Sequence, residues 1–141
     1  MSQTVHILYK DILKQVMILE SCKKEVAAQI LLTRNGKERL ALIYSFLNYD
    51  LDKHELLEHA AVLAMSNKEH TMMTDLGKLY SHREGEEVID KIRSEIKFVQ
   101  KFLQTINKAI KYPDARTFYE RRMIQEISKY VIEQSRLYNM I

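Results

Sequence analysis

Residues 88–110 read VIDKIRSEIKFVQKFLQTINKAI, and apolar side chains recur in this stretch at every third or fourth position. That period is typical of one face of an α-helix, so we predict a long amphipathic helix over 82–111. The apolar stripe covers about half of the helix circumference, which is wider than one neighbouring helix needs. Its members are Val88, Ile89, Ile92, Ile96, Val99, Phe102, Leu103, Ile106 and Ile110, with Phe98 on the flank.

The rest of the chain has the same character. Three glycines and one proline interrupt 141 residues, and apolar residues keep the helical period from end to end. We therefore predict a single all-α domain, residues 1–141, folded as a helical bundle of about six helices. The expected helices are 4–33, 37–48, 53–65, 68–80, 82–111 and 115–139.

The breaks between these helices are placed at residues with turn chemistry. Asn35-Gly36 tolerates the left-handed conformation that ends helices, and residues 48–52 form a second polar break in which Asp52 begins the next helix. Thr117 has capping-box spacing to Glu120, which predicts the start of the last helix. The Tyr112-Pro113-Asp114 connection is short, so we expect the last two helices to form a long C-terminal antiparallel hairpin.

Composition narrows the class of protein. Apolar residues make up 46% of the chain and charged residues 29%, as in ordinary globular proteins. Cys22 is the only cysteine, which excludes an internal disulfide and a cysteine-based zinc cluster. The N-terminal stretch lacks the layout of a signal peptide, and no apolar run reaches the roughly 20 residues that span a bilayer. We expect a reduced, cytoplasmic protein without a membrane span and without a cofactor.

Histidines supply no recognisable metal motif. His54 and His59 flank a pair of glutamates, but they are five residues apart and so differ by about 140° around a helix. A zinc-protease motif needs histidines four apart on one face. No histidine follows a glutamate at the spacing of the ferritin-like di-metal motif.

Four carboxylates form a better-spaced set. Glu55 and Glu58 precede Glu87 and Asp90, and the two pairs have the same spacing. The set resembles the paired carboxylates of MazG-like all-α nucleotide pyrophosphohydrolases, a resemblance that implies Mg²⁺ held between two helices. Each pair, however, points away from the apolar stripe of its own helix. We therefore expect these side chains to face solvent rather than to form a metal cluster.

Glu20 and Lys23 break the apolar stripe of the first helix. They fall on the line that connects Val16 and Leu19 with Val26 and Ala27, three residues apart and of opposite charge. A bend of the helix, or its emergence into water, would explain them. The alternative is a buried polar pair, which is costly to desolvate and could serve specificity or bind a polar ligand.

A second departure from the usual helix pattern is the placement of positive charges near the ends of the last two predicted helices. Lys108 and Lys111 end one predicted helix, where cations are favourable, but Arg116, Arg121 and Arg122 follow in the opening turns of the next, where cations oppose the helix dipole. The aromatic residues Tyr112, Phe118 and Tyr119 are interleaved with them. The surface formed by residues 108–122 is called the basic corner below. It is a candidate site for an acidic protein partner, for phosphate or nucleic acid, or simply a solvated face.

We find no phosphate-binding loop, nucleophile elbow or paired Cys and His. We therefore expect a non-enzymatic regulatory or adaptor protein that acts by protein–protein binding. The alternatives are a small-molecule-sensing helical domain with a pocket near Glu20 and Lys23, and a MazG-like hydrolase. The formal charge of +3 is small for a nucleic-acid-binding protein. The broad stripe on 82–111 predicts a homodimer joined through one or both C-terminal helices, with a seam containing Phe98, Phe102 and Tyr119.

Overall fold

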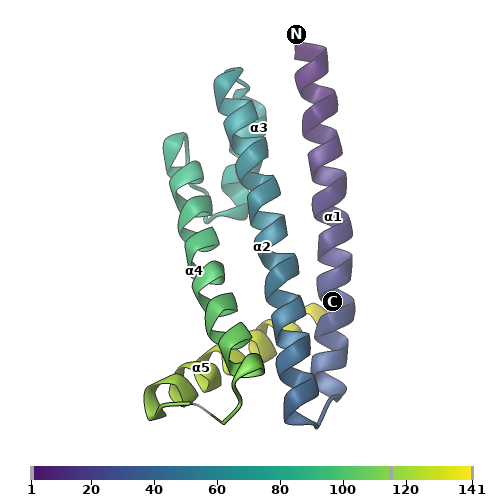
Figure 1. Cartoon of the computed structure of the whole chain (residues 1–141). Helices are drawn as coiled ribbons and strands as arrows, with labels where there is room; N and C mark the ends of the chain where they lie inside the picture. The colour runs from purple at the N-terminus through teal and green to yellow at the C-terminus, as the bar shows by residue number, and fades with distance from the viewer. Residues whose placement is uncertain (1, 115, 141) are drawn as a thin grey trace. The chain divides into compact units, whose positions relative to one another are not determined.

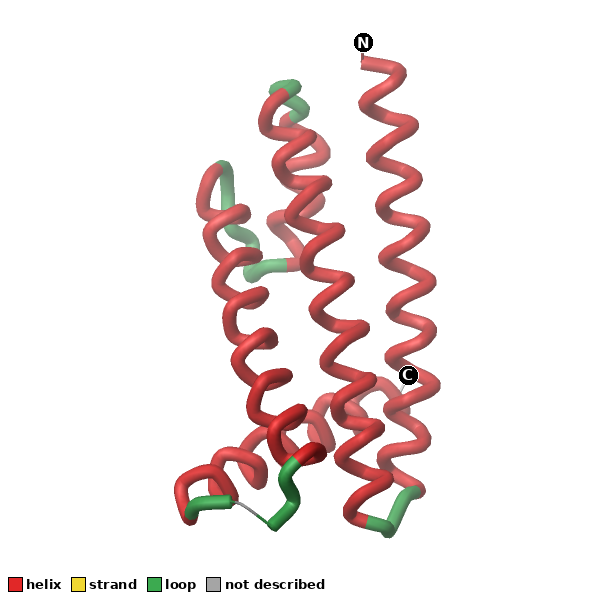
Figure 2. Tube along the Cα trace, in the orientation of Figure 1, coloured by secondary structure: helices red, strands yellow, loops and turns green. Residues whose placement is uncertain are grey.

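The computed structural model describes residues 2–114 and 116–140 and is all-α (Figure 1). Helix accounts for 87% of the described residues, and these residues contain no strand (Figure 2). The all-α helical bundle predicted from the sequence is therefore confirmed. Its five helices are α1 (Ser2–Leu32), α2 (Gly36–Ser66), α3 (His70–Leu79), α4 (Glu86–Lys111) and α5 (Phe118–Asn139).

The turn between α1 and α2 lies where it was predicted but has a different chemistry. The side-chain oxygen of Asn35 accepts hydrogen bonds from the backbone N–H groups of Lys37, at 2.9 Å, and Glu38, at 3.2 Å. Asn35 is thus the N-cap of α2 rather than a left-handed C-cap of α1. Arg39 secures the turn by donating to the carbonyl oxygen of Thr33 at 2.6 Å.

The second predicted break, at residues 48–52, is absent because α2 runs without interruption from Gly36 to Ser66. Asn, Tyr and Asp each disfavour a helix interior by only some tenths of a kcal/mol. Burial outweighs that preference here, since Phe46 and Leu47 are fully buried and Asp50 pairs with Lys23. The structure accordingly has five helices instead of about six, and Asp52 is not a helix cap.

Helix α2 ends without a glycine. Lys68 takes a left-handed conformation, its N–H donates to the carbonyl of Met65, and the N–H of Glu69 donates to the carbonyl of Ala64. These nested bonds form a Schellman motif. Helix α4 begins at Glu86, later than predicted, because Ser81, His82 and Gly85 are all left-handed.

The chain packs as two compact units, and α1, α2 and α4 each contribute residues to both. One unit comprises Met1–Leu19 with Leu51–Phe98, and we call it unit 1. Its core is apolar and contains three alanines of α2 that allow close helix packing. The buried residues of that core are Val5, Tyr9, Val16, Leu57, Ala60, Ala61, Ala64, Met72, Met73, Leu76, Tyr80, Val88, Ile89, Ile92 and Ile96.

Unit 2 comprises Glu20–Asp50 with Val99–Ile141. Thr117 caps α5 by accepting a hydrogen bond from the N–H of Glu120 at 3.1 Å, as its spacing predicts. The buried apolar residues of unit 2 are Ala27, Ile30, Ile43, Phe46, Leu47, Val99, Leu103, Ile106, Ala109, Ile124, Ile127 and Val131.

The antiparallel hairpin of the two C-terminal helices is not confirmed. Within unit 2, Glu120 near the start of α5 lies 3.4 Å from Lys108, and Tyr130 packs against Phe102. The last turn of α5 has different neighbours, because Tyr138 contacts Glu20 of α1 and Phe46 of α2. Helix α5 therefore joins α4 to α1 and α2 within this unit.

Gly77 is required by a close approach of two backbone segments in unit 1. A Cβ atom at this position would collide with the carbonyl oxygen of Arg83, a backbone atom that a rotamer change cannot remove. We expect Gly77→Ala to lower the free energy of unfolding by about 2 kcal/mol, as overpacking commonly does. Gly36→Ala is the control, since a Cβ there meets nothing within 4 Å. Urea unfolding of both variants measures the difference, and equal stabilities would contradict this account.

Candidate functional site

The basic corner is assembled from three consecutive pieces of unit 2. Lys108 and Lys111 lie in the last turn of α4, Arg116 lies in the connection, and Arg121 and Arg122 lie in the first turns of α5. The Thr117 cap fixes where α5 starts and hence where its cations lie. All five predicted cations therefore belong to one continuous stretch of chain.

Two of these cations stabilise the corner itself. Arg116 is partly buried and donates to the carbonyl oxygen of Ala109 at 3.0 Å, so its charge faces the C-terminal end of α4, where a cation is favourable. Lys108 lies 3.4 Å from the Glu120 carboxylate, which links the end of α4 to the start of α5. Both residues connect the two helices.

The other three cations, Lys111, Arg121 and Arg122, are exposed. No salt bridge involves them in the part of the chain that the structure describes. Aromatic side chains stand among them with large exposed fractions: Phe118 at 80%, Tyr119 at 70% and Tyr112 at 59%. The corner thus presents apolar rings and positive charge to solvent together.

Charge is unevenly distributed along the chain. Residues 108–122 contain five cations and two carboxylates, an excess of three positive charges. The whole chain has a formal charge of +3, so the remaining residues are neutral on balance. The basic corner therefore carries the entire net charge of the protein.

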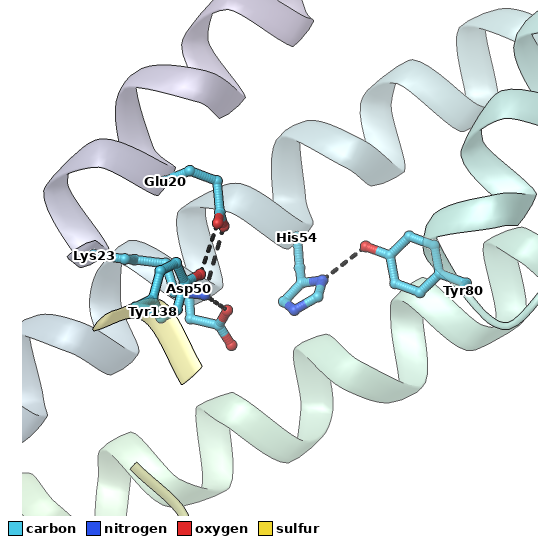
Figure 3. A network of polar contacts seen from close by, with 6 residues as sticks. All are labelled: Glu20, Lys23, Asp50, His54, Tyr80 and Tyr138. Carbon is cyan, nitrogen blue, oxygen red and sulfur yellow. Dashed lines mark hydrogen bonds and ion pairs between the residues drawn. The ribbon is translucent and has the colours of Figure 1, made fainter. Parts of the chain in front are cut away.

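A buried polar network lies elsewhere in unit 2, around Lys23 (Figure 3). The side chain of Lys23 is on α1 and the residue is only 5% exposed. Its ammonium group donates to the Asp50 carboxylate at 2.6 Å and lies 3.6 Å from a carboxylate oxygen of Glu20. The rings of Phe46 and Tyr138 are 5.0 and 5.2 Å away, within cation–π range.

Tyr138 completes this network from α5. Its hydroxyl group donates to Glu20 at 2.7 Å, and its ring meets that of Phe46 edge to face. Burial, followed by the hydrogen bond to the Glu20 carboxylate, raises the pKa of Tyr138 above its ordinary value of 10.0. The phenol is therefore held in its neutral, donating form.

The structure brings the predicted residues Glu20 and Lys23 together, but the nearest partner of Lys23 is Asp50, which sequence reasoning missed. Residues 48–52 are predicted as a break between helices, and an aspartate there suits a turn as well as a buried pair. The available signal was helical spacing, since Asp50 lies four residues after Phe46 and three after Leu47.

Unit 1 contains a separate polar contact that the sequence did not indicate. Nδ1 of His54, on α2, lies 2.8 Å from the hydroxyl group of Tyr80, the residue that follows α3 (Figure 3). Which of the two groups donates depends on the histidine tautomer. The contact ties the end of α3 to α2.

The four carboxylates of the MazG-like resemblance do not meet at a metal site. Glu55, Glu87 and Asp90 are exposed, and Glu58 accepts a hydrogen bond from Arg93 at 2.8 Å. Among the described residues, no three His, Cys, Asp or Glu side chains are grouped so that they could hold a metal ion. Glu55 instead lines a surface groove of about 560 Å³ in unit 1, whose other lining residues are Gln15, Ile18, Leu19, Asp52, Leu56 and His59.

No protein-family model, curated protein or solved structure matches the chain. Within the described residues, no helix has the length and apolar character needed to cross a membrane. The function is therefore inferred from the geometry and charge of the protein's own surfaces.

Substitutions at Lys23 and Asp50 test the buried pair. We expect Lys23→Met to lower the free energy of unfolding by about 3 kcal/mol, because it removes the buried ammonium group that lies 2.6 Å from the Asp50 carboxylate. Asp50→Leu should cost less, since Lys23 keeps Glu20 as a partner. The double variant should recover much of the loss, because an apolar pair of similar size needs no desolvated charge. Denaturant unfolding measures all three, and additive losses in the double variant would contradict the pairing.

Tyr138→Phe tests the pKa shift. At neutral pH it removes one hydrogen bond to a carboxylate and should cost about 1.5 kcal/mol. Because the pKa of Tyr138 is higher in the folded than in the unfolded protein, the stability that the hydroxyl contributes is present below pH 10 and is lost as the pH rises further. The advantage of the natural protein over Tyr138→Phe should therefore shrink above pH 10, by about 1.4 kcal/mol per unit. A constant difference from pH 8 to 11 would refute the shift.

Proposed function

We propose that this chain is a non-enzymatic regulatory or adaptor protein that binds an acidic protein partner through the basic corner. The observation that carries the proposal is the exposure of Tyr112, Phe118 and Tyr119 among Lys111, Arg121 and Arg122. A single exposed apolar side chain is ordinary, but three exposed rings within one short segment favour an interaction site.

The composition of the corner matches that of binding hot spots. Tyr, Phe and Arg are enriched at protein interfaces, where rings supply large contact areas and arginine forms bidentate bonds to carboxylates. The ring of Phe118 in particular contributes little to packing within the folded chain, since most of its surface is exposed. The excess of positive charge in this corner would also steer an acidic surface toward it.

An acidic protein fits this corner better than a nucleic acid does. Duplex binding depends on many phosphate contacts, and each contact requires a cation. Only three exposed cations of the corner take part in no salt bridge among the described residues, and the rest of the chain is neutral on balance. Three rings beside three cations suit a partner that offers apolar side chains as well as carboxylates.

The two alternative functions have less support. A small-molecule ligand at Lys23 would have to compete with Asp50, which already places a carboxylate 2.6 Å from the ammonium group. A MazG-like hydrolase would need Glu58 to leave Arg93 and the exposed carboxylates to converge.

Self-association is part of the same proposal. We propose a homodimer joined through the C-terminal helices, supported by the exposed apolar side chains Tyr119 and Leu137 on α5. Phe98 is exposed on α4, whereas Phe102 is half-buried against Tyr130 and offers less of its ring than the predicted seam requires.

The proposed location is the cytoplasm. Cys22 has a free thiol, and free thiols are typical of proteins in that reducing compartment.

A model partner tests the basic corner. The probe is a labelled helical peptide with leucines on one face and glutamates on the other, and fluorescence anisotropy measures its binding. Arg121→Glu/Arg122→Glu should weaken binding at least about tenfold, because it removes two cations and introduces like charge toward the probe. Binding by the natural protein should also weaken as salt is raised.

Lys10→Glu/Lys14→Glu is the matched control, since both lysines are exposed on α1 and the change in net charge is the same. Equal weakening by the two double variants would show a nonspecific charge effect and defeat the proposal. Tighter binding of a duplex DNA than of the peptide at the same salt concentration would assign the corner to nucleic acid instead.

A further inference from the structure

We infer that the partner on the exposed side of α5 is a second copy of this chain, whose own α5 lies antiparallel to it in a defined register. The inference rests on the proposed homodimer and specifies its helix and its contacts. Two rows of side chains on α5, one apolar and one charged, carry the argument.

The apolar row consists of Tyr119, Met123, Tyr130 and Leu137. At 100° per residue these four side chains fall within about 40° of one another, beside the buried face formed by Ile124, Ile127, Val131 and Ser135. Tyr119 and Leu137 are exposed at 70% and 55%, and they mark the ends of a row about 27 Å long. The rings of Tyr130 and Phe102 meet edge to face, and Tyr130 is itself exposed.

The charged row runs along the outer border of the apolar row. Its spacing alternates between four and three residues, and its charges alternate in sign. The members are Arg122, Glu126, Lys129, Glu133 and Arg136. None of them forms a salt bridge within the residues that the structure describes. Their charges are therefore available to a partner.

The two rows select the same antiparallel register. When Tyr119 lies opposite Leu137 of the second copy, a two-fold axis passes near residue 128 and the centres of the two apolar rows coincide. In that register Glu126 lies beside Lys129 of the second copy, and Arg122 lies beside Glu133 of the second copy. The symmetry repeats each pair, so opposite charges meet at four places.

A parallel pair does not have this property. Two antiparallel helices related by a two-fold axis place their charged rows on the same side of the seam, where the rows face each other. Parallel helices place the two charged rows on opposite sides of the seam. Each charged row then faces the side of the other helix that borders its buried face, and not the other charged row. The self-complementary charge pattern therefore favours the antiparallel pair, an isologous contact of the kind common in soluble dimers.

Mixing charge-reversed variants tests both the contact and its register. Glu126→Lys places two lysines beside each other in both symmetric contacts, and Lys129→Glu places two carboxylates there. Each variant alone should have a dimer dissociation constant at least about tenfold above that of the natural protein. An equimolar mixture should dimerise again, because each lysine then faces a carboxylate of the other variant. Sedimentation velocity measures the species, and circular dichroism confirms that both variants are folded.

Two further variants separate this inference from the basic corner. Leu137→Glu charges the apolar row and should yield a folded monomer, whereas Arg121→Glu lies off both rows and should leave the dimer unchanged. Peptide binding by the basic corner should survive Glu126→Lys, so either proposal can fail alone. The inference is overturned if the natural protein is a monomer at 100 µM, if the mixture does not dimerise, or if Leu137→Glu leaves the dimer intact.

Discussion

The ammonium group of Lys23 and the carboxylate of Asp50 form the contact on which unit 2 depends. Moving either charge out of water costs several kcal/mol, and only a close, well-oriented partner repays that cost. The 2.6 Å contact therefore fixes α1 and α2 in one register, because a shift by one residue would leave two buried charges apart. Tyr138 binds the same network through Glu20, so the last turn of α5 is held by the first two helices.

Both proposed surfaces depend on where α5 lies. At its first turn α5 is held by the Thr117 cap and by the contacts of Arg116 and Lys108 with their partners. At its last turn it is held by Tyr138. Between these two ends, Ile124, Ile127 and Val131 are buried and anchor one face of the helix. The buried face and the polar contacts at both ends position α5, and its exposed apolar residues remain available for binding.

The sequence predicts local features of this fold well and pairings poorly. Helical period identifies every helix, and capping chemistry places the start of α5 at Thr117. The same logic fails at residues 48–52, because helix propensity is worth tenths of a kcal/mol there and the burial of Phe46, Leu47 and Asp50 is worth more. Lys23 was recognisable as a charge on an apolar line, but Asp50 lies 27 residues away and only the packing of α1 against α2 identifies it.

The basic corner likewise shows that the sequence predicts where residues lie along the chain but not which partners they contact. The sequence presents five equivalent cations, and the structure divides them into two that connect α4 with α5 and three exposed cations that form no salt bridge among the described residues. Local spacing cannot make this division, because it depends on how the connection folds back on the end of α4. The predicted residues were therefore located correctly along the chain, but the role of each required the folded geometry.

The two proposed surfaces share residues, and this has a thermodynamic consequence. Tyr119 and Arg122 belong both to the basic corner and to the rows of the proposed antiparallel dimer. An acidic partner that takes Arg122 removes it from Glu133 of the second copy, and a second copy that buries Tyr119 removes a ring from the corner. Each binding event then changes the free energy of the other, and linkage requires the effect to be reciprocal. Competition of this kind would let the concentration of the chain itself regulate how much of it is available to the proposed partner.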